Sequence, residues 1–244
     1  MTAPRHLRGV ALNYADGAAP HAVTIRDARP LTARLSLDRQ GFELRPHATH
    51  VTHFDDPAEV RAVYYPEVED LLRAVTGARR AVAFEHDVRL SRGARAATVR
   101  RPVPVVHDDY TRVSAPGRVR LYLADEAATL LARRYAVINV WRSIAGVVRE
   151  SPLAVCDAET LAPADLRPTS EGVKHEVYLF RFRSRHRWYY FPAMDPGEAL
   201  LLKCFDAAPE GAARFTAHTA FDDPLTPPDA PPRASIEVRA LVFF

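Results

Sequence analysis

The chain has 244 residues, 33 basic and 30 acidic, which gives a formal net charge of +3 and a length typical of a single all-β domain. The near balance of charges argues against a nucleic-acid-binding surface, two cysteines are too few for a disulfide scaffold or a thiolate metal cage, and no apolar run is long enough to cross a membrane. Because the first residues also lack the apolar core of a signal peptide, we expect a cytoplasmic protein.

Short strands are predicted in the N-terminal part, over residues 9–14, 22–26, 34–37 and 42–44. A helix should follow them, because Asp56 stands directly before Pro57, and proline is favoured at the first helical position. This helix is expected to kink near Tyr65-Pro66 and to end at Gly77. Residues 1–80 are therefore predicted to form an N-terminal extension of strands and one helix.

From Ala81 onward, β-branched and aromatic residues dominate the sequence. They predict strands over residues 81–89, 103–111, 136–144, 152–156, 177–182, 188–191, 199–205, 214–220 and 236–244. One helix is predicted among them, over 125–134, with acids in its first turn and arginines in its last. The pattern predicts a mainly β sandwich or barrel of jelly-roll type in one domain, 1–244, whose core spans 81–244. Two long loops, 157–174 and 222–234, are expected to cover a site.

An imidazole and a carboxylate lie two residues apart at the end of the predicted strand 103–111. In an extended strand, the side chains of His107 and Asp109 share one face, whereas Asp108 points away from it. A second His-x-Asp copy begins at His53, but it lies at the predicted helix start, where capping explains its aspartate. His107 and Asp109 are therefore two candidate metal ligands. The alternative is that His107 is an ordinary histidine near a strand end.

His218, far along the chain, is the candidate third ligand. Two histidines and one carboxylate leave three positions free on an octahedral iron and are the ligand set of non-haem iron oxygenases. Arg239 alternates with apolar residues in the last strand, so its guanidinium is expected to be buried and to need an anion. The partner could be Glu237 or a nearby aspartate, or a dicarboxylate held by the arginine fork.

Several segments resemble one family of oxidoreductases. They are His107-Asp108-Asp109-Tyr110-Thr111, Ile138-Asn139-Val140-Trp141-Arg142, Pro152-Leu153-Ala154-Val155-Cys156-Asp157, Arg187-Trp188-Tyr189-Tyr190-Phe191-Pro192 and the run from His218 to Phe244. On these segments the chain resembles the CmcJ/NvfI-type oxidoreductases, which include a cephalosporin methoxylation component and fungal hydroxylase/desaturases. The resemblance covers most of the chain from Ala81 onward. It implies a double-stranded β-helix, a jelly-roll or cupin-like barrel, that uses Fe(II), 2-oxoglutarate and O2.

The resemblance also implies roles for single residues. His107, Asp109 and His218 would be the iron ligands, and Arg239 would bind the distal carboxylate of 2-oxoglutarate. In many such oxygenases the anchoring arginine follows the distal histidine by roughly ten residues, whereas here the separation is 239 − 218 = 21. The proline-rich insertion before the last strand can absorb the difference, but Arg233 is a rival for the same role.

Weaker candidates for the site lie on two other predicted strands. Asn139 could hydrogen-bond the co-substrate or only its neighbours. Trp141 and Arg142 lie on opposite faces of their strand, so at most one of them can point into the barrel and contact substrate. A structural ion pair is an equal alternative for Arg142. For Tyr189 the alternatives are substrate contact and core packing.

We therefore predict an Fe(II)/2-oxoglutarate-dependent dioxygenase that oxidises a C–H bond of a small secondary metabolite by hydroxylation, desaturation or ring formation. An iron oxidase that needs no 2-oxoglutarate is an alternative, in which Arg239 would bind the substrate. A non-catalytic β-barrel partner of a biosynthetic methyltransferase is another. A homodimer or a companion biosynthetic enzyme is left open, and neither nucleic acid nor a membrane is an expected partner.

Overall fold

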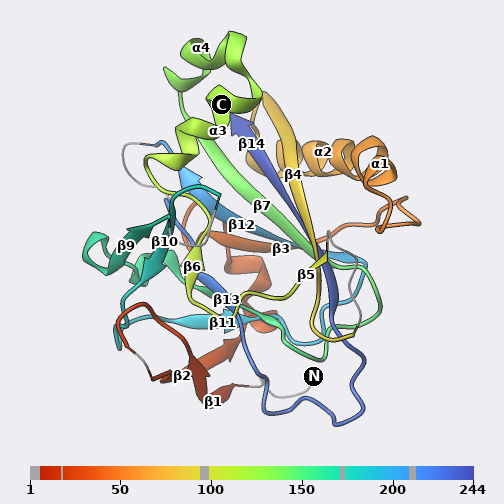
Figure 1. The fold of residues 1–244 in the computed structure, drawn as a ribbon, viewed down its shortest axis with the longest axis vertical. Coiled ribbons are helices and arrows are strands. Elements are labelled where there is room, and N and C mark those ends of the chain that lie inside the picture. Colours follow the sequence, from red (N-terminus) through yellow and green to blue (C-terminus); the bar gives the residue numbers. More distant parts are fainter. Residues whose placement is uncertain (1–5, 18, 94–98, 171–173, 209–212) are drawn as a thin grey trace.

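In the computed structural model, the chain folds into two β-sheets with an apolar core between them and helices on the outside (Figure 1). The structure describes residues 6–17, 19–93, 99–170, 174–208 and 213–244. The mainly β, jelly-roll-like architecture predicted from the sequence is confirmed. Within these ranges, no helix combines the length and the apolar character that a membrane crossing requires.

In the described part of the chain, the first sheet has eight strands in the order β1-β2-β11-β8-β13-β6-β10-β9. They are β1 Leu7–Leu12, β2 His21–Asp27, β6 His107–Asp108, β8 Leu153–Cys156, β9 Leu166–Thr169, β10 Val177–Phe180, β11 Trp188–Tyr190 and β13 His218–Ala220. Neighbouring strands are antiparallel, except that β2 and β11 are parallel. The short strands β6 and β13 in the interior of this sheet carry both predicted histidine ligands.

The second sheet has six strands among the described residues, in the order β3-β12-β7-β14-β4-β5. They are β3 Phe42–Pro46, β4 Arg80–Leu90, β5 Val99–Arg100, β7 Tyr135–Ser143, β12 Glu198–Asp206 and β14 Ala234–Phe243. Every residue of β7 and β14 is buried. These two strands are covered on both faces, by the first sheet on one side and by a helix on the other (Figure 1).

Alternate residues of the second sheet point into two separate apolar cores. Leu200 and Leu202 of β12 pack between the two sheets, whereas Leu201 packs under the helix on the outer face. The same alternation on β7 sends Trp141 to the inner core and Val140 to the outer one. Consecutive residues of these strands therefore pack on opposite faces of the sheet.

The predicted helix after the N-terminal strands is present and covers the outer face of the second sheet (Figure 1). It begins as α1, Pro57–Glu59, where the Asp56 side chain accepts a hydrogen bond from the backbone N–H of Ala58 at 2.8 Å. The predicted kink is a π-helical turn, Val60–Tyr64, which leads into α2, Tyr65–Thr76. Gly77, with φ of 69°, ends the helix as predicted.

A further helix, α3 Ser114–Tyr122, was not predicted. Its start is stabilised by reciprocal hydrogen bonds, because the Thr111 hydroxyl accepts from the Ser114 N–H at 3.0 Å and the Ser114 hydroxyl accepts from the Thr111 N–H at 2.9 Å. Pro116 lies in the first turn, where its missing N–H costs little. The predicted helix over 125–134 is shorter than expected and consists of a 3-10 turn, Ala124–Glu126, and α4, Ala127–Leu131.

The N-terminal strands belong to the two sheets. β1 and β2 lie at one edge of the first sheet, and β3 lies at one edge of the second (Figure 1). The predicted strand 34–37 is wrong, because Pro30 starts a 3-10 helix, Arg29–Arg34, in this part of the chain.

The two predicted loops differ in outcome. The predicted loop 157–174 contains the short 3-10 helices Ala158–Thr160 and Pro163–Asp165 and the strand β9, and its residues 171–173 lie outside the described residues. The segment 222–233 is the loop expected before the last strand.

Candidate metal centre

Two histidines and an aspartate from distant parts of the sequence meet between the two sheets. His107 on β6 and His218 on β13 are directly paired across the first sheet, and their ring centroids are 4.3 Å apart. Asp109 follows β6, and its Oδ1 lies 3.6 Å from Nε2 of His107. One possible ligand atom from each of the three lies within 4.8 Å of the other two. This is an arrangement in which all three side chains can bind one metal ion.

Hydrogen bonds at Nδ1 orient both imidazole rings. Nδ1 of His107 lies 2.7 Å from the carbonyl oxygen of Val105, and Nδ1 of His218 lies 3.0 Å from that of Thr216. Because a carbonyl oxygen only accepts, Nδ1 carries the proton in each ring and Nε2 keeps a lone pair. Burial, together with the neighbouring His218, lowers the pKa of His107 to about 3. In both rings Nε2 is therefore the nitrogen left to bind a metal ion, and at His107 the lowered pKa favours the neutral form that a metal ion requires.

The second carboxylate oxygen of Asp109 is held by the opposite sheet. Oδ2 accepts hydrogen bonds from Nδ2 of Asn139 at 2.7 Å and from Nε of Arg239 at 3.1 Å. Although burial opposes ionisation, the charge of Arg239 holds the pKa of Asp109 well below its usual range. Asp109 is therefore an oriented carboxylate, and its Oδ1 faces the histidines.

Arg239, the residue predicted to bind the distal carboxylate of 2-oxoglutarate, pairs with protein carboxylates in the structure. Each of its side-chain nitrogens donates to a protein carboxylate: Nε to Asp109, Nη1 to Asp87 at 3.1 Å and Nη2 to Glu237 at 2.9 Å. Strand register explains the arrangement, since Asp87 on β4 is paired with Glu237 on β14, and Arg239 is two residues further on the same face. The alternative that a nearby carboxylate satisfies Arg239 is the one that the structure shows.

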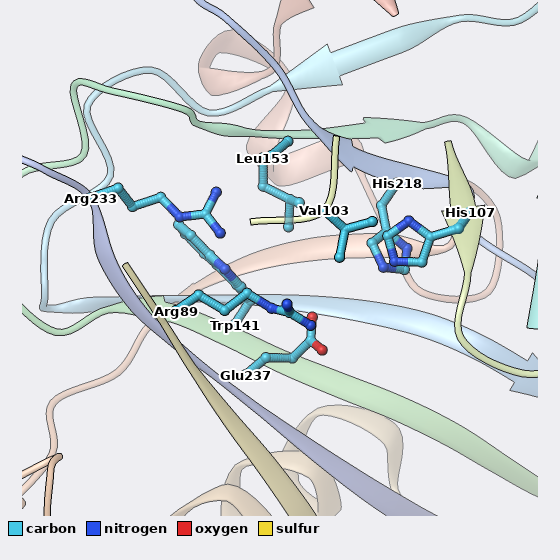
Figure 2. Close-up of a pocket in the computed structure, with 9 residues that line it drawn as sticks. Arg89, Val103, His107, Trp141, Leu153, His218, Arg233 and Glu237 are labelled. Carbon is cyan, nitrogen blue, oxygen red and sulfur yellow. The ribbon is translucent and has the colours of Figure 1, made fainter. Parts of the chain in front are cut away.

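A second buried arginine, Arg233, lines the pocket that contains the two histidines. Figure 2 shows His107 and His218 at one end and Arg233 at the other, with Trp141 beside it. The Arg233 guanidinium donates to the hydroxyl of Ser235 at 3.1 Å and to the carbonyl oxygen of Ser151. It also lies 5.3 Å from the ring centroid of Trp141.

No carboxylate in the described part of the chain forms an ion pair with Arg233, although the side chain is only 3 % exposed. Burial and the nearby charge of Arg89 lower the pKa of Arg233 to about 9. A buried cation of this kind is stabilised by an anion. The pocket therefore favours a ligand that brings a negative charge to Arg233.

Two other candidate residues, Trp141 and Asn139, lie on β7 next to this pocket. Of Trp141 and Arg142, it is Trp141 that points into the pocket, and its Nε1 is buried without a hydrogen-bond partner among the described residues (Figure 2). For Asn139 the structure shows the alternative of a contact with its neighbours, because its amide nitrogen donates to Asp109. Its Oδ1 is buried without a partner.

Arg142 and Tyr189 are not brought to the pocket. Arg142 lies on the outer face of β7, where its guanidinium carbon is 5.4 Å from the ring centroid of Tyr64. It cannot contact a substrate at the histidines, because the sheet separates the two faces. Tyr189 is on the same face as His218, two strands away, and packs on Phe42 at 5.9 Å between ring centroids. Core packing, the alternative for Tyr189, is the observed environment.

Two residues of the site were missed from the sequence. Asp87 and Arg89 alternate on β4 and point toward the inner face, where Asp87 binds Arg239 and Arg89 lines the pocket (Figure 2). The signal was present, because charged residues at alternate positions of a partly buried strand need partners inside.

A second group of possible ligand atoms consists of Asp108, Cys204 and His218. Burial raises the pKa of the Asp108 carboxyl and of the Cys204 thiol well above their usual values. Burial therefore favours the protonated form of both groups, whereas metal ligands must lose their protons. The set of His107, Asp109 and His218 is the better donor set.

Comparison with known proteins identifies the family. A family model described as "Oxidoreductase/YMDC permease-like domain" matches residues 6–243. The chain belongs to this family. Among the relatives of this family member, the "Hydroxylase/desaturase efuI" of Hormonema carpetanum is 33% identical over 91% of this chain and 83% of that protein. The "Fe(II)/2-oxoglutarate-dependent dioxygenase nvfI" of Aspergillus novofumigatus is 33% identical over 92% of this chain and 84% of that protein.

A solved structure shares the whole fold of this family member. The "iron and alpha-ketoglutarate-dependent endoperoxidase NvfI with different conformation" superposes with a TM-score of 0.88 and 28% identity, over 100% of this chain and 99% of that one. The resemblance inferred from the motifs is therefore confirmed.

Proposed function

We propose that this chain is a non-haem Fe(II)/2-oxoglutarate-dependent oxygenase. His107, Asp109 and His218 bind the iron, and Arg233 binds the distal carboxylate of 2-oxoglutarate. The observation that carries the proposal is that two imidazoles, each oriented through Nδ1, and a buried arginine that pairs with no carboxylate of the described residues line one pocket, with the Asp109 carboxylate beside the imidazoles. The relatives whose names specify Fe(II) and 2-oxoglutarate support it, because they cover nearly the whole chain.

The donor set fits ferrous iron. Two imidazole nitrogens and one carboxylate oxygen leave three positions of an octahedral ion open, which suffices for a bidentate 2-oxo acid and dioxygen. When bound, iron and 2-oxoglutarate supply the oxidation of a substrate C–H bond by O2, with formation of succinate and CO2. The backbone carbonyls of Val105 and Thr216 keep the two imidazoles oriented, and Asn139 and Arg239 keep Asp109 ionised and oriented.

Arg233 suits the co-substrate better than Arg239. Binding 2-oxoglutarate at Arg239 would require breaking ion pairs that are already formed with protein carboxylates. At Arg233 the same anion would pair with a buried cation that pairs with no carboxylate of the described residues, so no such ion pair would be lost. Arg89 and Glu237 line the same pocket and carry opposite charges, and Arg89 is paired with Asp87, so Arg233 is the cation there that pairs with no carboxylate of the described residues.

The remaining side chains of the pocket exclude water and position the substrate. Val103 and Leu153 lie between the arginine and the histidines (Figure 2). A small biosynthetic intermediate with a C–H bond next to the iron is the proposed substrate. The position in which it is held decides between hydroxylation, desaturation and ring formation. Relatives are named for hydroxylation or desaturation and for endoperoxidation, which supports a range of outcomes on this fold.

The two buried free cysteines fit a reducing, cytoplasmic location.

The test is to titrate Fe(II) and then 2-oxoglutarate into the purified protein without oxygen, and to measure succinate after air is admitted. We expect one iron per chain, a visible charge-transfer band of the iron-bound 2-oxo acid, and succinate release. His218→Ala should lose all three. His50→Ala is the matched control, because this imidazole is 92% exposed, and it should retain all three.

Other outcomes select the alternatives. Iron binding with oxygen consumption, but without the charge-transfer band or succinate, would indicate an iron oxidase that does not use 2-oxoglutarate. Failure to bind iron in the folded protein would favour a non-catalytic partner protein and would contradict the proposal.

A further inference from the structure

The carboxylate ligand Asp109 lies just beyond the end of a strand, where the strand pairing has ended. β6 is only two residues long and pairs with β10 at Tyr178 and Leu179. The next helix, α3, begins at Ser114. Asp109 therefore belongs to the connection between β6 and α3, although the residues of a binding site must be held in fixed positions.

The side chain of His175 holds the backbone of Asp109 at this point. Nε2 of His175, two residues before β10, lies 3.0 Å from the backbone carbonyl oxygen of Asp109. Because a carbonyl oxygen only accepts, Nε2 carries the proton and donates it to this hydrogen bond. Nδ1 of the same ring accepts from Nη2 of Arg118 on α3. Both ring nitrogens are thus used, and the imidazole joins the backbone of Asp109 to α3.

Ring contacts fix the plane of this imidazole. Tyr110, the residue after the ligand, stacks on His175 with 5.1 Å between the ring centroids and 12° between the ring planes. The guanidinium carbon of Arg118 lies 6.0 Å from the ring centroid of Tyr110. Glu176 accepts a hydrogen bond from the hydroxyl of Thr111. Residues 175 and 176 therefore hold the connection 109–111 on both sides of Tyr110.

The arginine that orients His175 has no ion pair in the described part of the chain. Arg118 is only 9% exposed, and its guanidinium contacts His175 and the Tyr110 ring rather than a carboxylate. A nearly buried arginine without a carboxylate adds little to stability, because its desolvation is not offset by an opposite charge. A role in orienting His175 explains the arrangement better than a role in stability.

We propose that His175 is a positioning residue of the metal centre. It holds the backbone of Asp109, while Asn139 and Arg239 hold the side chain, so that Oδ1 stays directed at the two imidazoles. His175 is not itself a ligand, because both of its ring nitrogens are occupied. This inference rests on the proposed function, since it concerns the carboxylate that binds the iron.

The experiment compares the Fe(II) affinities of two variants by anaerobic competition with a metal chelator. His175→Phe keeps a ring that can stack on Tyr110 but loses both hydrogen bonds, whereas His175→Gln loses the ring but keeps an N–H donor near the position of Nε2. Partners that orient a metal ligand typically change metal affinity 10- to 100-fold, so His175→Phe should lose roughly tenfold or more, and His175→Gln should stay within about threefold of the unchanged protein. Lys174→Ala, at the exposed neighbouring residue, is the control and should bind as the unchanged protein does.

A spectroscopic measurement separates positioning from general destabilisation. The charge-transfer band of the iron with 2-oxoglutarate depends on the geometry of the iron ligands. It should therefore shift in folded His175→Phe and keep its position in His175→Gln. If His175→Phe does not fold, Arg118→Met releases the other side of the imidazole and should weaken Fe(II) binding by roughly threefold or more.

The possible failures are distinguishable. An unchanged protein that binds no Fe(II) would contradict the proposed function, and the role of His175 with it. If the unchanged protein binds Fe(II), an equal affinity and an unshifted band in folded His175→Phe would overturn the role of His175 alone, as would an equal affinity in Arg118→Met where His175→Phe is unfolded. Equal losses in His175→Phe and His175→Gln would overturn it too, because they would assign the effect to the ring rather than to the hydrogen bond with Asp109.

Discussion

Two buried arginines of similar appearance in the sequence have different environments and different expected roles. Arg239 is surrounded by three carboxylates, whereas Arg233 has none among the described residues. The sequence indicated that Arg239 is buried and needs an anion, but it could not indicate which anion. That depended on the register of β4 and β14, which brings Asp87 beside it. The three metal-binding candidates were identifiable because His107 and Asp109 are two residues apart at a predicted strand end, and because the family resemblance supplied His218 as the third ligand.

Arg233→Gln is expected to weaken 2-oxoglutarate binding without unfolding the protein. A hydrogen bond to a charged group contributes about 1.5–3 kcal/mol, which corresponds to a loss of affinity of roughly 10- to 150-fold. Calorimetric titration of 2-oxoglutarate into the protein with bound Fe(II), under anaerobic conditions, measures it. Arg120→Gln, an exposed arginine of α3, is the control and should bind as the unchanged protein does.

Arg239→Met is expected to destabilise the whole protein. Its loss leaves Asp87, Asp109 and Glu237 buried close together without their common cation. Removing one partner of a buried ion pair costs about 3–5 kcal/mol. Denaturant unfolding of the metal-free protein measures this cost. Unchanged stability, with only weaker 2-oxoglutarate binding, would mean that Arg239 is the co-substrate residue after all.

Asn139→Leu tests the residue that orients the aspartate. The amide of Asn139 donates to Oδ2 of Asp109, and leucine has a similar size but no donor. Loss of a partner that orients a metal ligand typically lowers metal affinity 10- to 100-fold. Competition with a metal chelator measures the Fe(II) affinity. Ser143→Ala on the same strand, whose hydroxyl binds backbone carbonyls, should change it little, and equal losses in both variants would exclude a specific role for Asn139.

At the scale of elements, strong local signals were predictive and weak ones were not. The helix from Pro57 to Gly77 followed from a cap, a proline and a terminal glycine, each of which acts within a few residues. Helix α3 was missed because Pro116 and Gly117 argue against a helix, and the reciprocal capping by Thr111 and Ser114 outweighs them. Strand order in the sheets depends on contacts between distant segments, such as β2 beside β11, which no local pattern specifies.

The turn before β3 is expected to control the position of His218. Gly41 has φ of 86°, and a Cβ added there would lie 2.2 Å from the hydroxyl oxygen of Thr216. Thr216 donates to the Gly41 carbonyl at 2.9 Å, and its own carbonyl oxygen accepts from Nδ1 of His218. Gly41→Ala should therefore displace Thr216 and weaken Fe(II) binding by roughly tenfold or more.

Gly146→Ala is the control for Gly41→Ala, because it strains the backbone without displacing Thr216. Gly146 also has a positive φ, of 66°, but a Cβ there meets nothing within 4 Å. Both variants should lose about 1–2 kcal/mol of stability from the left-handed backbone, and only Gly41→Ala should lose metal affinity. Equal Fe(II) affinities in the two variants would show that the contact with Thr216 does not matter to the metal centre.

At the scale of the whole molecule, the metal centre joins the two sheets. His107 and His218 belong to the first sheet, whereas Asp109 is held by Asn139 and Arg239 of the second. A bound divalent ion would therefore link both sheets and offset the negative charge around Arg239. A homodimer or a companion biosynthetic enzyme, left open from the sequence, concerns surfaces outside this centre.

Removal of the metal is expected to lower thermal stability. An ion present at a hundred times its dissociation constant stabilises the folded state by about 2.7 kcal/mol, which corresponds to a Tm shift of roughly 5–10 °C in a chain of this size. Thermal unfolding with Mn(II) and with excess chelator measures the shift. His218→Ala should unfold at one temperature under both conditions, and a full shift in that variant would place the ion elsewhere.

The most direct measurement is an anaerobic crystal structure of the protein with Fe(II) and 2-oxoglutarate. We expect one iron bound by Nε2 of His107, Nε2 of His218 and Oδ1 of Asp109, with the distal carboxylate of 2-oxoglutarate on the guanidinium of Arg233. Iron bound at other residues, or a distal carboxylate that avoids Arg233, would contradict the proposed site.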